Sequence, residues 1–192
     1  MLELKPNEHM IKIIVMEVSN NGEGDQNGGS ETDSHANMIV VGNESFVFSH
    51  SGLSATVKAF SKEAKRMTEV PIVDAVLAYD CPFTGLTYLL VARNALCVPS
   101  MNHNLIPPFI MQEAGLVVNE TPKIHCDDPT VEDHSIFDEE SGLRTPLTLN
   151  GIFSVFPTRA LTEQEIEEVG LYKIFFLTPD SNQWDPYNVS YN

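Results

Sequence analysis

Cationic residues are scarce in this chain of 192 residues. Only 11 Lys and Arg stand against 27 Asp and Glu, which gives a formal net charge of −16. Proteins that bind the phosphate backbone need clustered Lys and Arg, so the composition argues against direct nucleic-acid binding. The one small basic cluster, Lys62, Lys65 and Arg66, is interpreted as the solvated face of a short helix.

Cysteine is also scarce. The three cysteines, Cys81, Cys97 and Cys126, are odd in number and widely spaced, so a disulfide framework is not expected. None of them forms a Cys-x-x-Cys pair, which argues against a structural zinc site. The acidic stretch at residues 125–140 follows no spacing typical of metal ligands and is interpreted as solvated loops. We therefore expect no metal and no other cofactor.

Long apolar runs and the common nucleotide and hydrolase motifs are missing too. The apolar stretch at residues 10–16 is too short to span a bilayer and lacks the pattern of a signal peptide. We therefore expect a cytoplasmic protein with no membrane partner. No glycine-rich phosphate loop follows a strand, and neither His-Glu-x-x-His nor Gly-x-Ser-x-Gly occurs.

Strand-like sequence is what the chain does contain, and it predicts a mainly β fold. With 42% hydrophobic residues the chain can bury a core. Two runs rich in Val, Ile, Leu and Tyr, at residues 70–79 and 86–98, flank a segment full of turn residues and predict a β-hairpin. Other strands are expected at residues 9–18, 38–48 with a turn at 42–44, 116–119 and 147–156, and residues 171–177 form a further apolar run.

Short helices are expected at two places. Residues 109–114 precede Gly115, a residue typical of helix ends. Residues 162–169 open with Thr162 and Glu165 at the spacing of a capping box. Residues 54–67 fit either a short helix or a strand around 55–60, and both remain open. The polar segments at 20–30 and 179–192 are expected to be loops.

The most informative motif is Asp33-Ser34-His35-Ala36, which stands just before an apolar run. An acidic residue followed by a hydroxyl residue and a small residue, between strands, is typical of the catalytic loop of aspartic peptidases. The hydroxyl can hold the turn, and the small residue allows another backbone to come close. Asp-Ser pairs also occur in ordinary turns and helix N-caps, so this reading stays open on the motif alone.

A second block supports the first. Residues 94–99 read Asn-Ala-Leu-Cys-Val-Pro, and Asn104-Leu105-Ile106 and Gly115 follow at fixed spacing. Together the two blocks resemble the protease region of copia-type retrotransposon polyproteins over roughly residues 31–125. The resemblance implies a retropepsin-like closed β domain at residues 31–125 with short helices. An N-terminal strand and flexible polar loop at residues 1–30 would precede it, and an irregular acidic extension at residues 126–192 would follow it.

The resemblance also implies an activity. Such a domain is an aspartic endopeptidase that cleaves polyprotein peptides with an activated water, and it works as a homodimer in the cytoplasm, including virus-like particles. Each copy supplies one catalytic aspartate, which here is Asp33, and two close carboxyl groups share a proton. Ser34 is expected to hydrogen-bond near this pair and Ala36 to pack beneath it. The flap over the peptide is expected at the tip of the hairpin, at Tyr79, Asp80, Cys81, Pro82, Phe83, Thr84 and Gly85.

His35 departs from the family pattern, which usually has glycine at this position. The imidazole ring is tolerated if it points outward, and it abolishes the dimer if it points into the approaching backbone. The alternative hypothesis is therefore a catalytically inactive relic of the fold that serves dimerisation or scaffolding.

Overall fold

The computed structural model describes residues 11–13, 29–59 and 67–180. Several expectations lie outside these residues. They are most of the first strand, the polar loop as far as residue 28, the basic cluster Lys62, Lys65 and Arg66, and the tail from residue 181.

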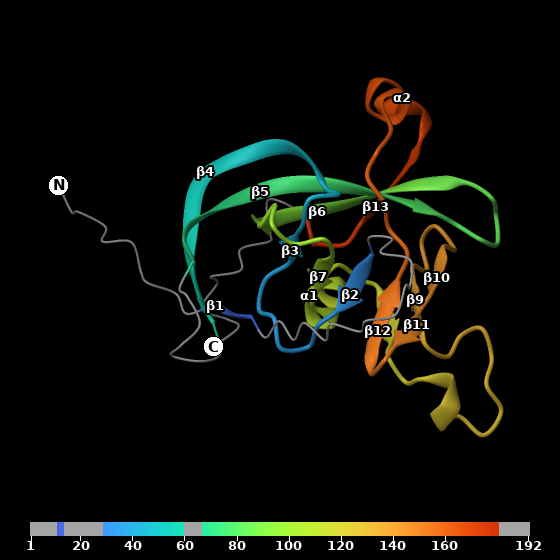
Figure 1. The fold of residues 1–192 in the computed structure, drawn as a ribbon. Coiled ribbons are helices and arrows are strands. Elements are labelled where there is room, and N and C mark those ends of the chain that lie inside the picture. The colour runs from blue at the N-terminus through green and yellow to red at the C-terminus, as the bar shows by residue number, and fades with distance from the viewer. Residues whose placement is uncertain (1–10, 14–28, 60–66, 181–192) are drawn as a thin grey trace, which may run out of the picture.

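The described chain is mainly β, as the sequence predicts, and most of its strands form one sheet (Figure 1). Within the described residues the strand order is β1-β4-β5-β6-β3-β7-β2-β12-β11, and β13 pairs with β6. The bounds are β1 Ile11–Ile13, β2 Ser30–Thr32, β3 Val40–Val41, β4 Phe46–Ala59, β5 Met67–Asp80, β6 Thr87–Cys97, β7 Asn104–Ile106, β11 Thr148–Asn150, β12 Phe153–Phe156 and β13 Lys173–Phe176.

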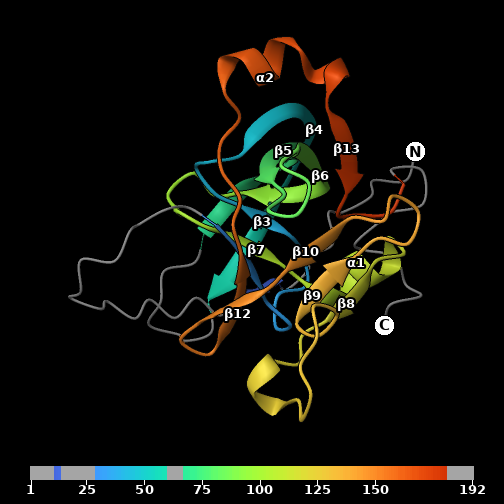
Figure 2. The ribbon, with the colours of Figure 1, turned by 90° about the vertical axis from the view of Figure 1, so that its right-hand side faces the viewer.

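A second, smaller sheet and short helices complete the described structure. The small sheet has the order β10-β9-β8, with β8 at Val117–Asn119, β9 at Ser135–Phe137 and β10 at Arg144–Pro146. The helices are α1 Pro108–Glu113, α2 Glu163–Glu167 and the 3-10 turns Lys123–His125 and Val169–Leu171. Figure 2 shows α2 at one end of the molecule and the turn Lys123–His125 at the other.

The expectation of a closed β structure is wrong for the described strands. Their path through the large sheet is open, with β1 at one end and β11 at the other. The β4–β5 register shifts at three places, and such irregularities bend a strand pair. In Figure 1 these two strands curve away from the sheet and do not return toward β11.

The expected irregular extension beyond residue 125 is also different in the structure. β12 pairs with β2, β13 pairs with β6, and β9 pairs with β8, so strand pairing crosses the expected boundary. The physical reason lies in the alternating burial of β12, which turns Ser154 and Phe156 inward. The segment expected as one strand at 147–156 is a hairpin, β11–β12, whose turn contains Gly151 at a φ of 64°.

The strong local signals are confirmed. β5 and β6 form the predicted hairpin, and α1 forms where a helix was expected. The Thr162 hydroxyl accepts the Glu165 N–H at 3.2 Å, and Glu165 Oε2 accepts the Thr162 N–H at 2.8 Å, which completes the capping box. The open choice at residues 54–67 resolves as strand for the described residues 54–59, which belong to β4.

The side chain of Asn104 joins three parts of the large sheet. It is fully buried at the start of β7, and its Oδ1 accepts the backbone N–H of Gly42 at 2.9 Å, just beyond β3. Its Nδ2 donates to Ser30 Oγ at 3.2 Å, at the start of β2. Gly42 must remain glycine, because a Cβ there would lie 2.5 Å from the carbonyl oxygen of Met101. Together Asn104 and Gly42 fix the two ends of the segment that carries residues 33–39.

We predict that Asn104→Ala lowers the free energy of unfolding by about 3 kcal/mol, because buried polar groups on β2 and after β3 lose their hydrogen-bond partner. The matched control is Asn102→Ala in the same connection, an exposed position where the expected change is within about 0.5 kcal/mol. Urea denaturation measures both. Equal stability of the two variants would contradict the role given to Asn104.

Candidate active site around Asp33

Asp33 follows the last residue of β2 and opens the segment that leads to β3. Its backbone N–H donates to the carbonyl oxygen of Ile106 at 3.2 Å, which continues the parallel pairing of β2 with β7. The N–H of Ala36 donates back to the Asp33 carbonyl oxygen at 3.3 Å and closes a turn. The catalytic-loop motif therefore forms a turn anchored on β7.

One oxygen of the Asp33 carboxyl group accepts a hydrogen bond, and the other has no hydrogen-bond partner among the described residues. The side chain is 9% exposed, and its Oδ1 accepts the backbone N–H of His35 at 2.8 Å. Its Oδ2 is buried and accepts no hydrogen bond from the described residues. A buried polar atom of this kind costs free energy unless a partner reaches it, so Oδ2 is the most conspicuous polar atom of the site.

The other motif residues differ in exposure. Ala36 is buried. Ser34 is exposed, and its Oγ lies 3.4 Å from His35 Nδ1. The His35 side chain is 69% exposed, with Nδ1 3.9 Å from Asp33 Oδ1. Its ring therefore points away from the rest of the described chain.

Glu31 is a second acidic residue at this site, and the sequence reasoning missed it. It lies two residues before Asp33, so both side chains project from the same face of an extended chain. Burial, followed by the nearby Asp33 carboxylate, raises the pKa of Glu31 to about 7. The signal was available in the period-two spacing of two acidic residues at the end of a strand.

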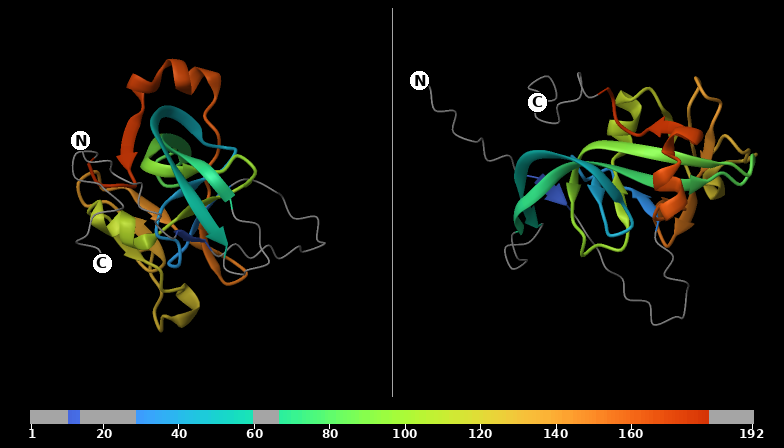
Figure 3. Two further views of the ribbon diagram at one scale, coloured as in Figure 1. Left: turned by 90° about the vertical axis from the view of Figure 1, so that its left-hand side faces the viewer. Right: turned by 90° about the horizontal axis from the view of Figure 1, so that it is seen from above.

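The structure does not bring residues 79–85 to Asp33. Figure 1 shows the β5–β6 turn at one end of the sheet and the segment after β2 nearer the opposite end. In the view from above, the bend of β4 and β5 again lies at the end opposite that turn (Figure 3).

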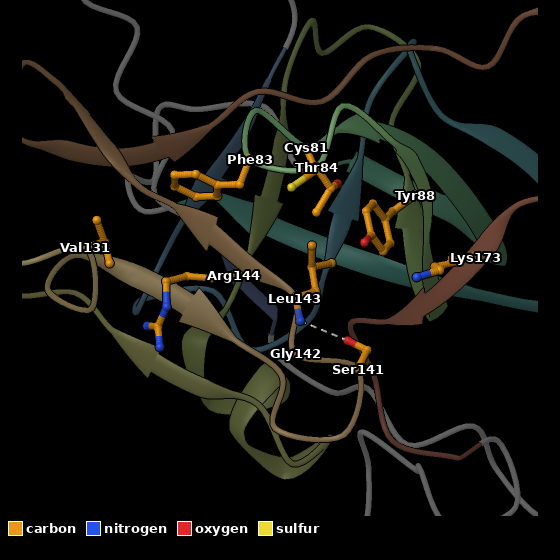
Figure 4. Close-up of a pocket in the computed structure, with 10 residues that line it drawn as sticks. All are labelled: Cys81, Phe83, Thr84, Tyr88, Val131, Ser141, Gly142, Leu143, Arg144 and Lys173. Carbon is orange, nitrogen blue, oxygen red and sulfur yellow. Dashed lines mark hydrogen bonds between the residues drawn. The ribbon is translucent and has the colours of Figure 1, made fainter.

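Contacts between this turn and other parts of the chain hold it in this position. Tyr79 is buried in the core, and Asp80 Oδ2 accepts a hydrogen bond from Arg159 Nε at 2.7 Å. Arg159 Nη2 also pairs with Glu165 Oε1 at 2.8 Å, so α2 and the turn are tied together. Phe83 and Thr84 line a shallow pocket of about 390 Å³ opposite Leu143 (Figure 4).

Metal-ligand clusters and membrane-spanning helices are absent from the described part of the chain. No group of three or more His, Cys, Asp or Glu side chains there is placed to hold a metal ion. Among the same residues, no helix has the length and apolar character needed to cross a membrane.

Comparisons with protein-family models, curated proteins and solved structures find no match to this chain.

Glu31 makes stability depend on pH in a defined direction. Its pKa is raised from 4.5 to about 7 in the folded state, so the folded protein holds this proton more tightly than the unfolded chain. The contribution of Glu31 to stability is therefore complete below pH 4.5 and is lost as the pH rises through 7. We predict that Glu31→Gln raises the free energy of unfolding at pH 8 by about 2 kcal/mol. This value is smaller than the pKa shift alone implies, because solvent screens the charge of a partly exposed carboxyl group.

Urea denaturation between pH 4 and pH 8 measures this effect. The control is Glu139→Gln, an exposed position in a turn, which we expect to leave the pH profile of the wild type unchanged. Carboxyl NMR of Asp33→Asn should show the pKa of Glu31 lowered only partly, since burial remains the larger cause. A pH profile of Glu31→Gln that matches the wild type would contradict the assignment.

Proposed function

We propose that this chain is the aspartic endopeptidase region of a copia-type retrotransposon polyprotein and cleaves polyprotein peptides as a homodimer. The observation that carries the proposal is the meeting of the two sequence blocks behind the resemblance. β2, which leads into Asp33, pairs in parallel with β7, which is the Asn104-Leu105-Ile106 block. The retropepsin-like identity of the domain and its action in the cytoplasm, including virus-like particles, belong to the same proposal.

The chemistry of Asp33 suits a paired site. One carboxyl oxygen is oriented by the His35 N–H, and the other is buried without a partner among the described residues. In the proposed dimer, a second copy of Asp33 lies across a two-fold axis and the two carboxyl groups share one proton. One carboxylate then takes a proton from water, whose oxygen bonds the scissile carbonyl carbon, while the other carboxyl protonates the carbonyl oxygen. The C–N bond breaks as the leaving nitrogen receives a proton.

Histidine in place of glycine is compatible with this chemistry. Asp33 uses the backbone N–H of residue 35, which any residue except proline provides. His35 is not among the residues with positive φ, so the turn does not require glycine.

The flap is better assigned to the β4–β5 hairpin than to residues 79–85. Its strands are 14 residues long each, and they bend toward the end of the molecule where the segment after β2 lies (Figure 1). Phe48 and Leu53 on β4 are more than half exposed, which gives this hairpin apolar surface for a bound peptide. A peptide would bind beneath it in extended form, with strand-like backbone hydrogen bonds.

The second candidate function is a non-catalytic module for dimerisation or scaffolding. The exposed imidazole of His35 beside Asp33 favours it, since a bulky ring stands at the face that a second copy would approach.

Subunit mixing separates the two candidates. We predict that the full chain cleaves peptides spanning the junctions of its own polyprotein, and that Asp33→Asn lowers kcat/KM by about a thousandfold or more. Because the proposed site needs one Asp33 from each copy, excess Asp33→Asn protein should also suppress the wild-type activity by forming mixed dimers.

The matched control is Asp180→Asn, which alters the chain's other Asp-Ser pair, an exposed one. It should cleave like the wild type and should not suppress it. Wild-type activity that Asp33→Asn neither loses nor suppresses would contradict the paired site, and a complete lack of cleavage by a dimeric wild type would favour the non-catalytic module.

A further inference from the structure

Glu31 on β2 and Asp33 just after it lie on the side of the chain opposite the one on which Ser30 and Thr32 make hydrogen bonds. On the opposite face, Ser30 Oγ lies 2.8 Å from Thr158 Oγ1, and Thr32 Oγ1 donates to Glu120 Oε1 at 2.6 Å. Side chains alternate along a strand, so these inward hydrogen bonds turn Glu31 to the side of Asp33. The carboxyl group of Glu31 therefore lies on the same side of the chain as that of Asp33 and close to it.

The surroundings of Glu31 are apolar. Its register neighbours are Leu105 on β7 and Val155 on β12, and Leu105 is 2% exposed. Glu31 itself is partly buried, and the Asp33 carboxylate is close enough to raise the pKa of Glu31 further. Within the described residues no cation neutralises it. A desolvated carboxyl group beside a like charge is unfavourable, which calls for a binding partner.

We propose that Glu31 is a specificity-determining residue that selects a Lys or Arg side chain next to the scissile bond of the peptide. This inference rests on the proposed function. The alkyl stem of such a side chain packs beside the partly exposed Val155, and its cationic end reaches the carboxylate. The charge-assisted hydrogen bond restores the interaction that Glu31 loses on burial. The net charge of −16 adds a field that attracts cationic peptides.

Cleavage of matched peptides tests the selection. Each peptide pair carries either Lys or the uncharged norleucine at the positions flanking the scissile bond, and kcat/KM is measured for the full chain. We expect the wild type to prefer Lys by about tenfold or more, as a charged hydrogen bond allows. Glu31→Gln should bring the ratio near one, and Glu31→Leu should reverse it. The control Glu139→Gln should keep the wild-type ratio.

Binding to inactive protein separates this inference from the proposed function. Asp33→Asn protein should bind the Lys peptide about tenfold more tightly than the norleucine peptide by calorimetry, and the added Glu31→Gln change should abolish the difference. Equal binding of the two peptides, or cleavage without a preference for Lys, overturns the role of Glu31. Glu31-dependent binding of Lys without any cleavage by the wild type overturns the peptidase proposal and leaves Glu31 as a cation-recognition residue.

Discussion

The buried carboxamide of Asn104 is the interaction on which the rest of the structure depends. It bonds the start of β2 and the turn after β3 from the first residue of β7. These hydrogen bonds are buried, so water could not replace the Asn104 carboxamide as the partner of these polar groups if it were removed. The close approach of Gly42 to the Met101 carbonyl oxygen adds a steric condition. The segment carrying Asp33 is thus fixed at both ends by chain about 70 residues away.

This constraint explains why the site can hold an unfavourable arrangement of charge. Asp33 Oδ2 is buried without a partner among the described residues, and Glu31 lies beside it with its pKa raised to about 7. Each feature lowers the stability of the fold. A loosely held loop would avoid this cost by exposing the carboxyl groups to water. The hydrogen bonds of Asn104 and the buried strand β3 prevent that relaxation. The proposed peptide would supply a cationic partner for Glu31.

The sequence predicted what local patterns encode. The β5–β6 hairpin, α1 and the capping box at Thr162 and Glu165 depend on neighbours in the chain, and all three are present. The pairing of β12 with β2 and of β13 with β6 depends on contacts across more than 80 residues, which no local pattern reports. Asp33 was found by its motif, and the spacing of Glu31 from Asp33 offered a signal for Glu31, whereas the position of the β5–β6 turn needed the fold.

The central claim is that two copies of the chain form one site from two Asp33 carboxyl groups. The most direct test measures peptidase activity and sedimentation together over a dilution series of the purified chain. The account predicts that specific activity rises with concentration in proportion to the fraction of dimer and vanishes in the monomer. Full activity in a sedimenting monomer would contradict it.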